Sequence, residues 1–191
     1  VEGKLQEISE LNLKGIKMLP TVQFFNPSEN KNFERICEYC EKKRKVILYH
    51  TGCDPGPWEI PELAEDANPK YLKPVLEKYR PNIILAHAGA YSKFKPGLWL
   101  DEALNIGSVF ENVYLDSSAV SNIIYSEKVL KKVKDRVGIE RLLYGSDFPA
   151  VGGSNMQHEI NVIKNCQYLT DEEKNMILGL NAAKLLGVKL T

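Results

Sequence analysis

The chain has 191 residues, 43% of them hydrophobic, and its 25 Lys and Arg balance 25 Asp and Glu to a formal net charge of zero. This composition is typical of a folded domain with one large core and excludes intrinsic disorder. The balanced charge argues against nucleic-acid and membrane partners, and the apolar runs are too short to span a bilayer. Four cysteines, with no recognisable signal peptide before them, indicate a reducing environment, so we expect a cytoplasmic protein.

Five short apolar runs recur at intervals of about 30 residues, and stretches with helical periodicity separate them. This alternation predicts βα units whose parallel strands are buried on both faces. The fold class is therefore predicted to be α/β, with a parallel sheet or barrel in a single domain over residues 1–191. The predicted strands are Gly15 to Leu19, Lys45 to Tyr49, Asn82 to Ala86, Asn112 to Leu115 and Arg141 to Tyr144.

Helices are predicted between the strands from apolar residues that recur three or four positions apart. The first of them carries Cys37-x-x-Cys40, which is half of a zinc or redox motif. No second pair follows at zinc-finger spacing and both sulfurs fall on the apolar face, so we predict core packing for them. Further helices are predicted over Pro69 to Tyr79, Ser126 to Val137, Gln157 to Cys166 and Asp171 to Leu186.

The connection from Thr51 to Asn68 is long and contains several Gly and Pro residues as well as Trp58. Long loops in compact domains are usually functional. We therefore predict that this loop borders the site and that Trp58 contacts the substrate.

Polar residues follow four of the predicted strands at their carboxyl ends, namely His50, His87, Asp116 and Asp147. In parallel α/β proteins this edge collects the ligand-binding and catalytic groups. Imidazole and carboxylate together suit zinc or a related divalent ion. We predict that His50, His87 and Asp147 lie around one point and serve metal binding or catalysis. Two interpretations remain open for Asp116: it is either a site residue or the cap of the helical turn that follows.

Three other residues have weaker signals. Lys17 lies inside the first predicted strand, where a buried lysine is a structural ion-pair partner, a clamp for a substrate anion or a Schiff-base nucleophile; we favour the first two. His158 falls in the first turn of a predicted helix and is expected at the surface or in a cap. Cys53 follows His50 closely, but nothing marks it as a nucleophile.

Taken in order, these motifs resemble the amidohydrolase superfamily. The resemblance is greatest to the TIM-barrel amidohydrolase-2 proteins related to aminocarboxymuconate-semialdehyde decarboxylase. It covers nearly the whole chain, and it rests on Gly15-Ile16-Lys17-Met18-Leu19-Pro20, Tyr49-His50-Thr51-Gly52, Leu85-Ala86-His87-Ala88-Gly89, Val113-Tyr114-Leu115-Asp116-Ser117, Gly145-Ser146-Asp147-Phe148-Pro149 and Asn181-Ala182-Ala183-Lys184-Leu185-Leu186.

The resemblance implies one divalent metal, expected to be zinc. His50 would be its ligand on strand 5 of the barrel, and Asp147 its ligand on strand 8 and a proton acceptor. His87 would be the catalytic histidine of strand 6 or a ligand of a second metal, and Lys17 would lie on strand 4. Apart from the resemblance, we predict that Lys17, Asp116 and Trp58 bind the substrate. The implied reaction is hydrolysis of a C–N or C–O bond in a small carbonyl substrate; the alternative is non-oxidative decarboxylation.

The resemblance also implies a partial TIM (β/α)8 barrel that holds strands 4 to 8 with their helices. No His-x-His pair, which the family carries on strand 1, occurs in the sequence. Eight units of about 30 residues need about 240, so we expect the first three units to be absent and two strand edges to be open. Association with the missing N-terminal segment, or a homo-oligomer, would cover them. A non-catalytic barrel fragment is the remaining alternative.

Overall fold

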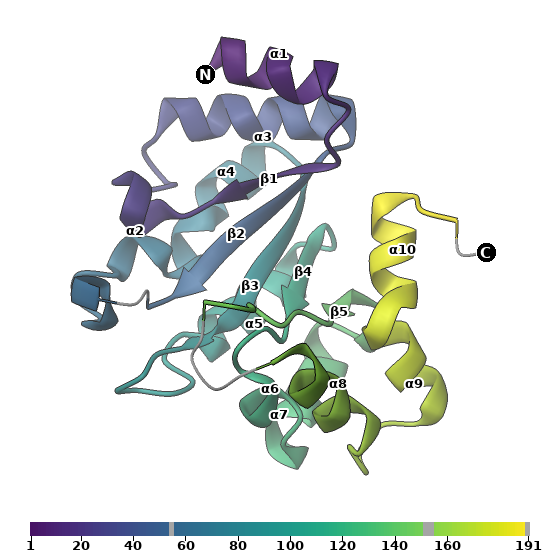
Figure 1. Cartoon of the computed structure of the whole chain (residues 1–191). Coiled ribbons are helices and arrows are strands. Elements are labelled where there is room, and N and C mark those ends of the chain that lie inside the picture. The colour runs from purple at the N-terminus through teal and green to yellow at the C-terminus, as the bar shows by residue number, and fades with distance from the viewer. Residues whose placement is uncertain (54–55, 151–154, 190–191) are drawn as a thin grey trace.

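The computed structural model describes residues 1–53, 56–150 and 155–189, and its centre is one parallel sheet (Figure 1). Every strand pairs in parallel with the strand that follows it in the chain, which gives the order β1-β2-β3-β4-β5. This confirms the predicted α/β class with a parallel sheet. The strands are β1 (Gly15–Met18), β2 (Val46–Gly52), β3 (Asn82–Tyr91), β4 (Val113–Asp116) and β5 (Leu142–Leu143).

Helices connect the strands, and α1 lies alongside α3 (Figure 1). They are α1 (Glu2–Glu10), α2 (Pro20–Gln23), α3 (Lys31–Lys43), α4 (Lys73–Lys78), α5 (Leu100–Val109), α6 (Ser121–Ile124), α7 (Glu127–Arg136), α8 (Met156–Lys164), α9 (Asp171–Asn175) and α10 (Asn181–Leu186). A π-helical turn, Met176–Leu180, joins α9 to α10, and short 3-10 turns occupy Gly56–Glu59, Glu65–Ala67, Pro69–Leu72 and Ile139–Arg141. None of the described helices is long and apolar enough to cross a membrane.

The two faces of the sheet differ because successive side chains of a strand point to opposite sides. On the face that packs against α3, Ile47 and Tyr49 of β2 are completely buried and belong to the same core as Phe33. On the other face, Leu48 of β2 and Ile84 of β3 are only partly buried. The face that carries Leu48 and Ile84, called the inner face below, is therefore the more open face of the sheet.

Cys37 and Cys40 lie in α3 on its buried face, and both are 0% exposed. Burial is the main cause that raises the pKa of both thiols, that of Cys40 to about 12. Thiols that are buried and protonated pack as small apolar groups. The prediction of core packing is confirmed.

Three helical segments differ from the sequence-based expectation. The predicted helix over Pro69 to Tyr79 is a 3-10 turn followed by the short α4. The predicted last helix is interrupted by the π turn between α9 and α10. Helix α5 was not predicted. Its N-cap residue, Trp99, provides no side-chain cap, so the usual start signal is missing.

Helix α10 begins with Asn181, which is buried against the end of the sheet. Its Nδ2 group donates hydrogen bonds to the carbonyl oxygens of Ile139 at 2.7 Å and Leu142 at 2.9 Å. These bonds fasten the C-terminal helix to β5, and so hold the strand that leads into Asp147.

Candidate active site at the carboxyl ends of the strands

His50 and His87 lie next to each other at the carboxyl ends of β2 and β3. The centroids of their rings are 4.9 Å apart and the ring planes cross at 68°. Both residues are nearly inaccessible, with 5% of His50 and 3% of His87 exposed. The sheet therefore brings together two of the histidines singled out from the sequence.

An irregularity in β3 produces the position of His87. Between the pairs His50↔Ala86 and Gly52↔Tyr91, β2 advances by two residues while β3 advances by five. The φ angles of His87, Ala88 and Gly89 are 64°, 48° and 69°, so the inserted residues form a left-handed turn. Bulges of this kind commonly re-aim a side chain beside an active site.

Thr51 of β2 holds this turn from one side. Its hydroxyl donates a hydrogen bond of 2.5 Å to the carbonyl oxygen of Ala86 and accepts one of 2.8 Å from the Gly89 N–H. Gly89 has no alternative, because a Cβ there would lie 2.4 Å from the Trp99 carbonyl oxygen. The turn is therefore fixed by the hydrogen bonds of the Thr51 hydroxyl and by the requirement for glycine at position 89.

Asp116 at the end of β4 holds the same turn from the other side. Its Oδ1 accepts hydrogen bonds from the His87 N–H at 2.9 Å, the Ser118 N–H at 3.0 Å and the Ser118 hydroxyl at 2.5 Å. The capping interpretation does not describe this arrangement, since α6 begins only at Ser121 and Val120 is its N-cap. The Asp116 carboxylate instead closes a local turn and binds the main chain of His87.

The His87 ring is oriented by Ser118. Its Nδ1 atom lies 2.9 Å from both the carbonyl oxygen and the hydroxyl oxygen of Ser118. A carbonyl oxygen can only accept, so Nδ1 is the nitrogen that donates.

The pKa of His50 is lowered well below its ordinary value. Burial is the largest cause, and the nearby His87 and Lys17 act in the same direction against backbone hydrogen bonds at Gly52 and Cys53. At neutral pH the imidazole is therefore uncharged, which is the state in which histidine binds metal ions.

A cavity of about 330 Å³ opens beside His87 on the inner face of the sheet. Of the other residues predicted for the site, Lys17, Asp116 and Asp147 line it. Lys17 is exposed within this open face, so the expectation of a buried lysine is wrong. Asp147 follows β5 in a left-handed conformation, with φ of 54°. The remaining lining residues include Leu48, Ile84, Ala86, Ser118, Leu143, Tyr144 and Ala182.

Trp58 is not among the described residues that line this cavity. It lies in the 3-10 turn Gly56–Glu59, where its ring meets that of Phe24 edge to face at a centroid distance of 6.4 Å. Two other residues lie apart from the cavity. His158 is exposed in α8, and Cys53 is buried in a small cluster with Ala64 and Ala67.

The predicted metal ligands are of suitable chemical types for a divalent metal, but they are too few to hold one. His50 supplies a neutral imidazole and Asp147 a carboxylate, both suitable ligands. However, the described residues contain no group of three His, Cys, Asp or Glu arranged to hold a metal ion. A full coordination shell thus needs ligands beyond those that this part of the chain brings together.

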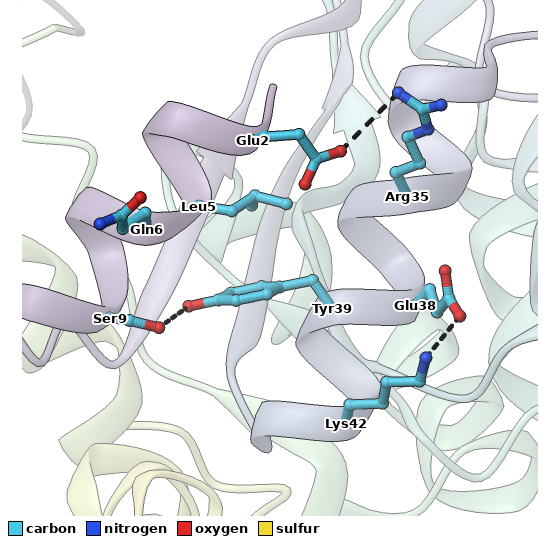
Figure 2. A pocket seen from close by; sticks show the side chains of 8 residues that line it. All are labelled: Glu2, Leu5, Gln6, Ser9, Arg35, Glu38, Tyr39 and Lys42. Carbon is cyan, nitrogen blue, oxygen red and sulfur yellow. Dashed lines mark hydrogen bonds and ion pairs between the residues drawn. The ribbon is translucent and has the colours of Figure 1, made fainter.

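A larger cavity, of about 570 Å³, lies in the outer layer between α1 and α3 (Figure 2). Tyr39 crosses it to hydrogen-bond Ser9 at 2.7 Å, and ion pairs such as Glu2 with Arg35 at 3.7 Å line it. None of the predicted site residues lines this cavity. Its side chains are paired with one another, so it is a packing gap between two helices in our interpretation.

Thr51 and Ser118 were not among the site residues predicted from the sequence. Thr51 directly follows His50 within a quoted motif, whereas Ser118 comes two residues after Asp116, just beyond the quoted motif. Hydroxyl groups have no characteristic spacing that would reveal their bonding partners. Only the juxtaposition of β2, β3 and β4 shows what they do.

Comparison with known proteins shows that residues 3–188 match the model of the amidohydrolase-2 family. The chain is 24% identical over 220 residues to 2-amino-3-carboxymuconate-6-semialdehyde decarboxylase of Dictyostelium discoideum. This alignment covers 98% of the chain and 58% of the decarboxylase, so the chain spans less than two thirds of that relative.

Two solved structures illustrate the similarity of fold. An uncharacterised TIM-barrel protein from Bordetella bronchiseptica superposes with a TM-score of 0.76 at 17% identity, covering 97% of this chain and 61% of that one. A dihydroxybenzoic acid decarboxylase from Polaromonas, with bound manganese and an inhibitor, superposes with a TM-score of 0.60 at 15% identity, covering 85% of this chain and 55% of that one.

Proposed function

Because the chain belongs to the amidohydrolase-2 family, as the match over residues 3–188 shows, we propose that it carries part of the active site of a metal-dependent enzyme. Its substrate would be a small carbonyl or carboxylate compound bound on the inner face of the sheet. The observation that carries the proposal is the arrangement at the ends of the strands. His87, Lys17 and Asp147 share one cavity there, and the His50 ring lies 4.9 Å from that of His87.

We further propose that the five strands are strands 4 to 8 of a TIM barrel. Five parallel strands in chain order, each followed by helical structure, support this assignment. The similarity to a TIM-barrel protein of which the chain covers 61% supports it as well. The partly exposed Leu48 and Ile84 would then belong to the interior of the closed barrel, and further strands or a second copy would cover them.

In this proposal His50 and Asp147 hold the metal together with ligands from outside the described residues. A divalent ion, when bound, polarises substrate oxygens and makes a proton easier to remove from water. Asp147 accepts a proton, and His87 transfers one at Nε2, because its Nδ1 is committed to Ser118. The exposed ammonium group of Lys17 attracts a substrate carboxylate into the cavity.

Two reactions fit these roles. Decarboxylation needs a proton delivered to the carbon that loses carbon dioxide, whereas hydrolysis needs a proton moved from water to the leaving group. The name of the Dictyostelium relative favours decarboxylation, and the name of the family favours hydrolysis. We propose decarboxylation of an unsaturated or aromatic acid as the first reaction to test, and hydrolysis as the second.

The test uses the chain loaded with Zn²⁺ or Mn²⁺ and a panel of carboxylated aromatic acids and lactones. Release of carbon dioxide indicates decarboxylation, and ring opening without it indicates hydrolysis. Asp147→Asn should lower the rate by about 10² to 10⁴, the range for loss of a proton-transferring group. His158→Gln is the matched control, since His158 is exposed and lies outside the cavity. Equal rates for Asp147→Asn and the unchanged chain would refute the role of Asp147.

Metal content separates the enzyme from a non-catalytic fragment. After dialysis, about one tightly held ion per chain would support the proposed metal site and contradict the fragment hypothesis. No retained ion, together with no turnover, would mean that this chain lacks the activity on its own. Loss of half of a coordination shell weakens metal binding severely, so this measurement is decisive.

A further inference from the structure

We propose that Asp116 and Ser118 are positioning residues that set the tautomer of His87, and that Asp116 is not a contact for substrate charge. The assignment of a proton-transfer role to His87 rests on the proposed function. The hydrogen-bond network itself does not, because it is built entirely from residues of β3 and the end of β4.

The directions of the hydrogen bonds follow from the chemistry of each atom. The Ser118 carbonyl oxygen can only accept, so His87 Nδ1 carries the proton in the neutral ring. An ionised Asp116 carboxylate can only accept, so the Ser118 hydroxyl donates to Asp116 Oδ1 at 2.5 Å. The Ser118 oxygen is then oriented to accept from His87 Nδ1 at 2.9 Å. One proton arrangement satisfies the whole chain of bonds.

The same carboxylate also fixes the main chain that carries the ring. Asp116 Oδ1 accepts from the His87 N–H at 2.9 Å, at the first residue of the left-handed turn. For residues other than glycine this conformation is unfavourable, so it persists only where contacts over-determine it. Asp116 therefore holds both the backbone and, through Ser118, the ring of His87.

Ser118 is itself held in place by close packing. A Cβ at Gly145 would lie 2.9 Å from the Ser118 Cβ and 3.3 Å from Asp116 Oδ2, so only glycine lets the end of β5 approach this closely. Asp116, Ser118 and His87 are all buried, with 7%, 5% and 3% of each residue exposed. A buried network that is fully satisfied holds one geometry, which is what a tautomer lock requires.

The first test determines the tautomer of His87 in the unchanged chain, and variants serve only to assign the signals. The chain has three histidines, so the side-chain nitrogen spectrum of ¹⁵N-histidine-labelled protein contains three rings, which His87→Asn and His158→Gln assign. We expect His87 to carry its proton on Nδ1 and to have a bare Nε2 in the metal-free, substrate-free chain. A proton on Nε2 of His87 would overturn the inference.

The second test compares Asp116→Asn with Asp116→Ala. The amide oxygen of Asn can still accept from the His87 N–H and from Ser118, so the Nδ1 tautomer and slow exchange of the His87 amide should remain. Alanine removes the acceptor, so exchange should accelerate and the second tautomer should appear. Equal spectra for the two variants would contradict the inference. Should the alanine variant fail to fold, the tautomer of the unchanged chain still tests the inference, because a proton on Nε2 of His87 would overturn it.

Kinetics separate positioning from substrate contact. We expect Asp116→Ala to lower kcat by about 10- to 100-fold with little change in KM, and Asp116→Asn to lower kcat by less, as for other residues that orient a reacting group. A large rise of KM in both variants, with the tautomer unchanged, would make Asp116 a substrate contact. A locked tautomer without any turnover would mean that this chain lacks the proposed activity on its own, and it would leave this inference standing.

Discussion

The Thr51 hydroxyl on β2 accepts a hydrogen bond of 2.8 Å from the Gly89 N–H on β3, across the turn that carries His87. The same hydroxyl donates a hydrogen bond to the Ala86 carbonyl oxygen. One side-chain oxygen therefore bridges Ala86 and Gly89, the residues that flank His87 and Ala88. Two buried main-chain groups would lose their partner if it were removed.

Thr51→Val removes this oxygen and keeps the shape of the side chain. We expect the free energy of unfolding to fall by about 1 to 3 kcal/mol, the cost of leaving buried polar groups unsatisfied. Thr51→Ser keeps the hydroxyl and is the matched control, with a loss below about 1 kcal/mol. Urea denaturation measures both. A valine variant as stable as the serine variant would show that the bridge is not needed.

Gly89→Ala tests the steric requirement of the same turn. The new Cβ would meet the Trp99 carbonyl oxygen at 2.4 Å at a φ of 69°, so we expect a loss of about 2 to 4 kcal/mol. Gly179→Ala is the control, since a Cβ at Gly179 meets nothing within 4 Å in the helical segment. It should be neutral or stabilising by up to about 1 kcal/mol. Thermal unfolding should therefore occur at a lower temperature in Gly89→Ala and at an equal or higher temperature in Gly179→Ala than in the unchanged chain.

Asn181→Asp tests the link between α10 and β5. Asn181 donates to two carbonyl oxygens, and a carboxylate would place negative charge against both of them. We expect a loss of about 2 to 4 kcal/mol at pH 7, which shrinks in acid as the carboxyl becomes protonated. Asn175→Asp, at an exposed position of α9, should change stability by less than about 0.5 kcal/mol. Similar losses for both variants would contradict this role of Asn181.

Glu173 should make stability depend on pH in mild acid. Burial acts to raise the pKa of Glu173, but hydrogen bonds from Lys134 and from Thr170 at the start of α9 outweigh it and hold the pKa below 4.5. Because the unfolded chain binds the proton more readily, the stabilisation is complete above about pH 4.5. It is lost as the pH falls through the lower pKa of the folded state.

We therefore expect Glu173→Gln to be less stable than the unchanged chain by about 1 kcal/mol at pH 7, with a gap that narrows toward pH 3. Glu172→Gln, an exposed acid in the same helical turn, is the control and should show no such narrowing. Denaturation in urea at several pH values measures both. A constant gap across this range would mean that Glu173 does not titrate with folding.

The positions of the strands could be predicted because continuous apolar runs identify buried parallel strands. The full extent of β3 could not, since the left-handed turn at His87 interrupts the run before Ala90 and Tyr91 rejoin the sheet. Likewise, strand ends located His50, His87, Asp116 and Asp147, because the carboxyl ends of parallel strands meet at one edge.

The role of each side chain depended on directions in space that the sequence does not encode. Asp116 was predicted to be a substrate contact or a helix cap, and nothing in the sequence indicated that it also binds the main chain of His87. Trp58 looked like a cavity residue because its loop is long, yet its ring packs on Phe24. Such contacts depend on how helices and strands pack against each other, and the sequence periodicity of a single helix or strand does not predict that packing.

The turn at His87 is held from β2 by Thr51 and from β4 by Asp116, so the groups that arrange the chemistry also contribute to folding. Many active sites are places where activity is gained at the expense of stability. Here the two properties would decline together. A screen for folded, protease-resistant variants would thus also enrich variants in which this turn is intact.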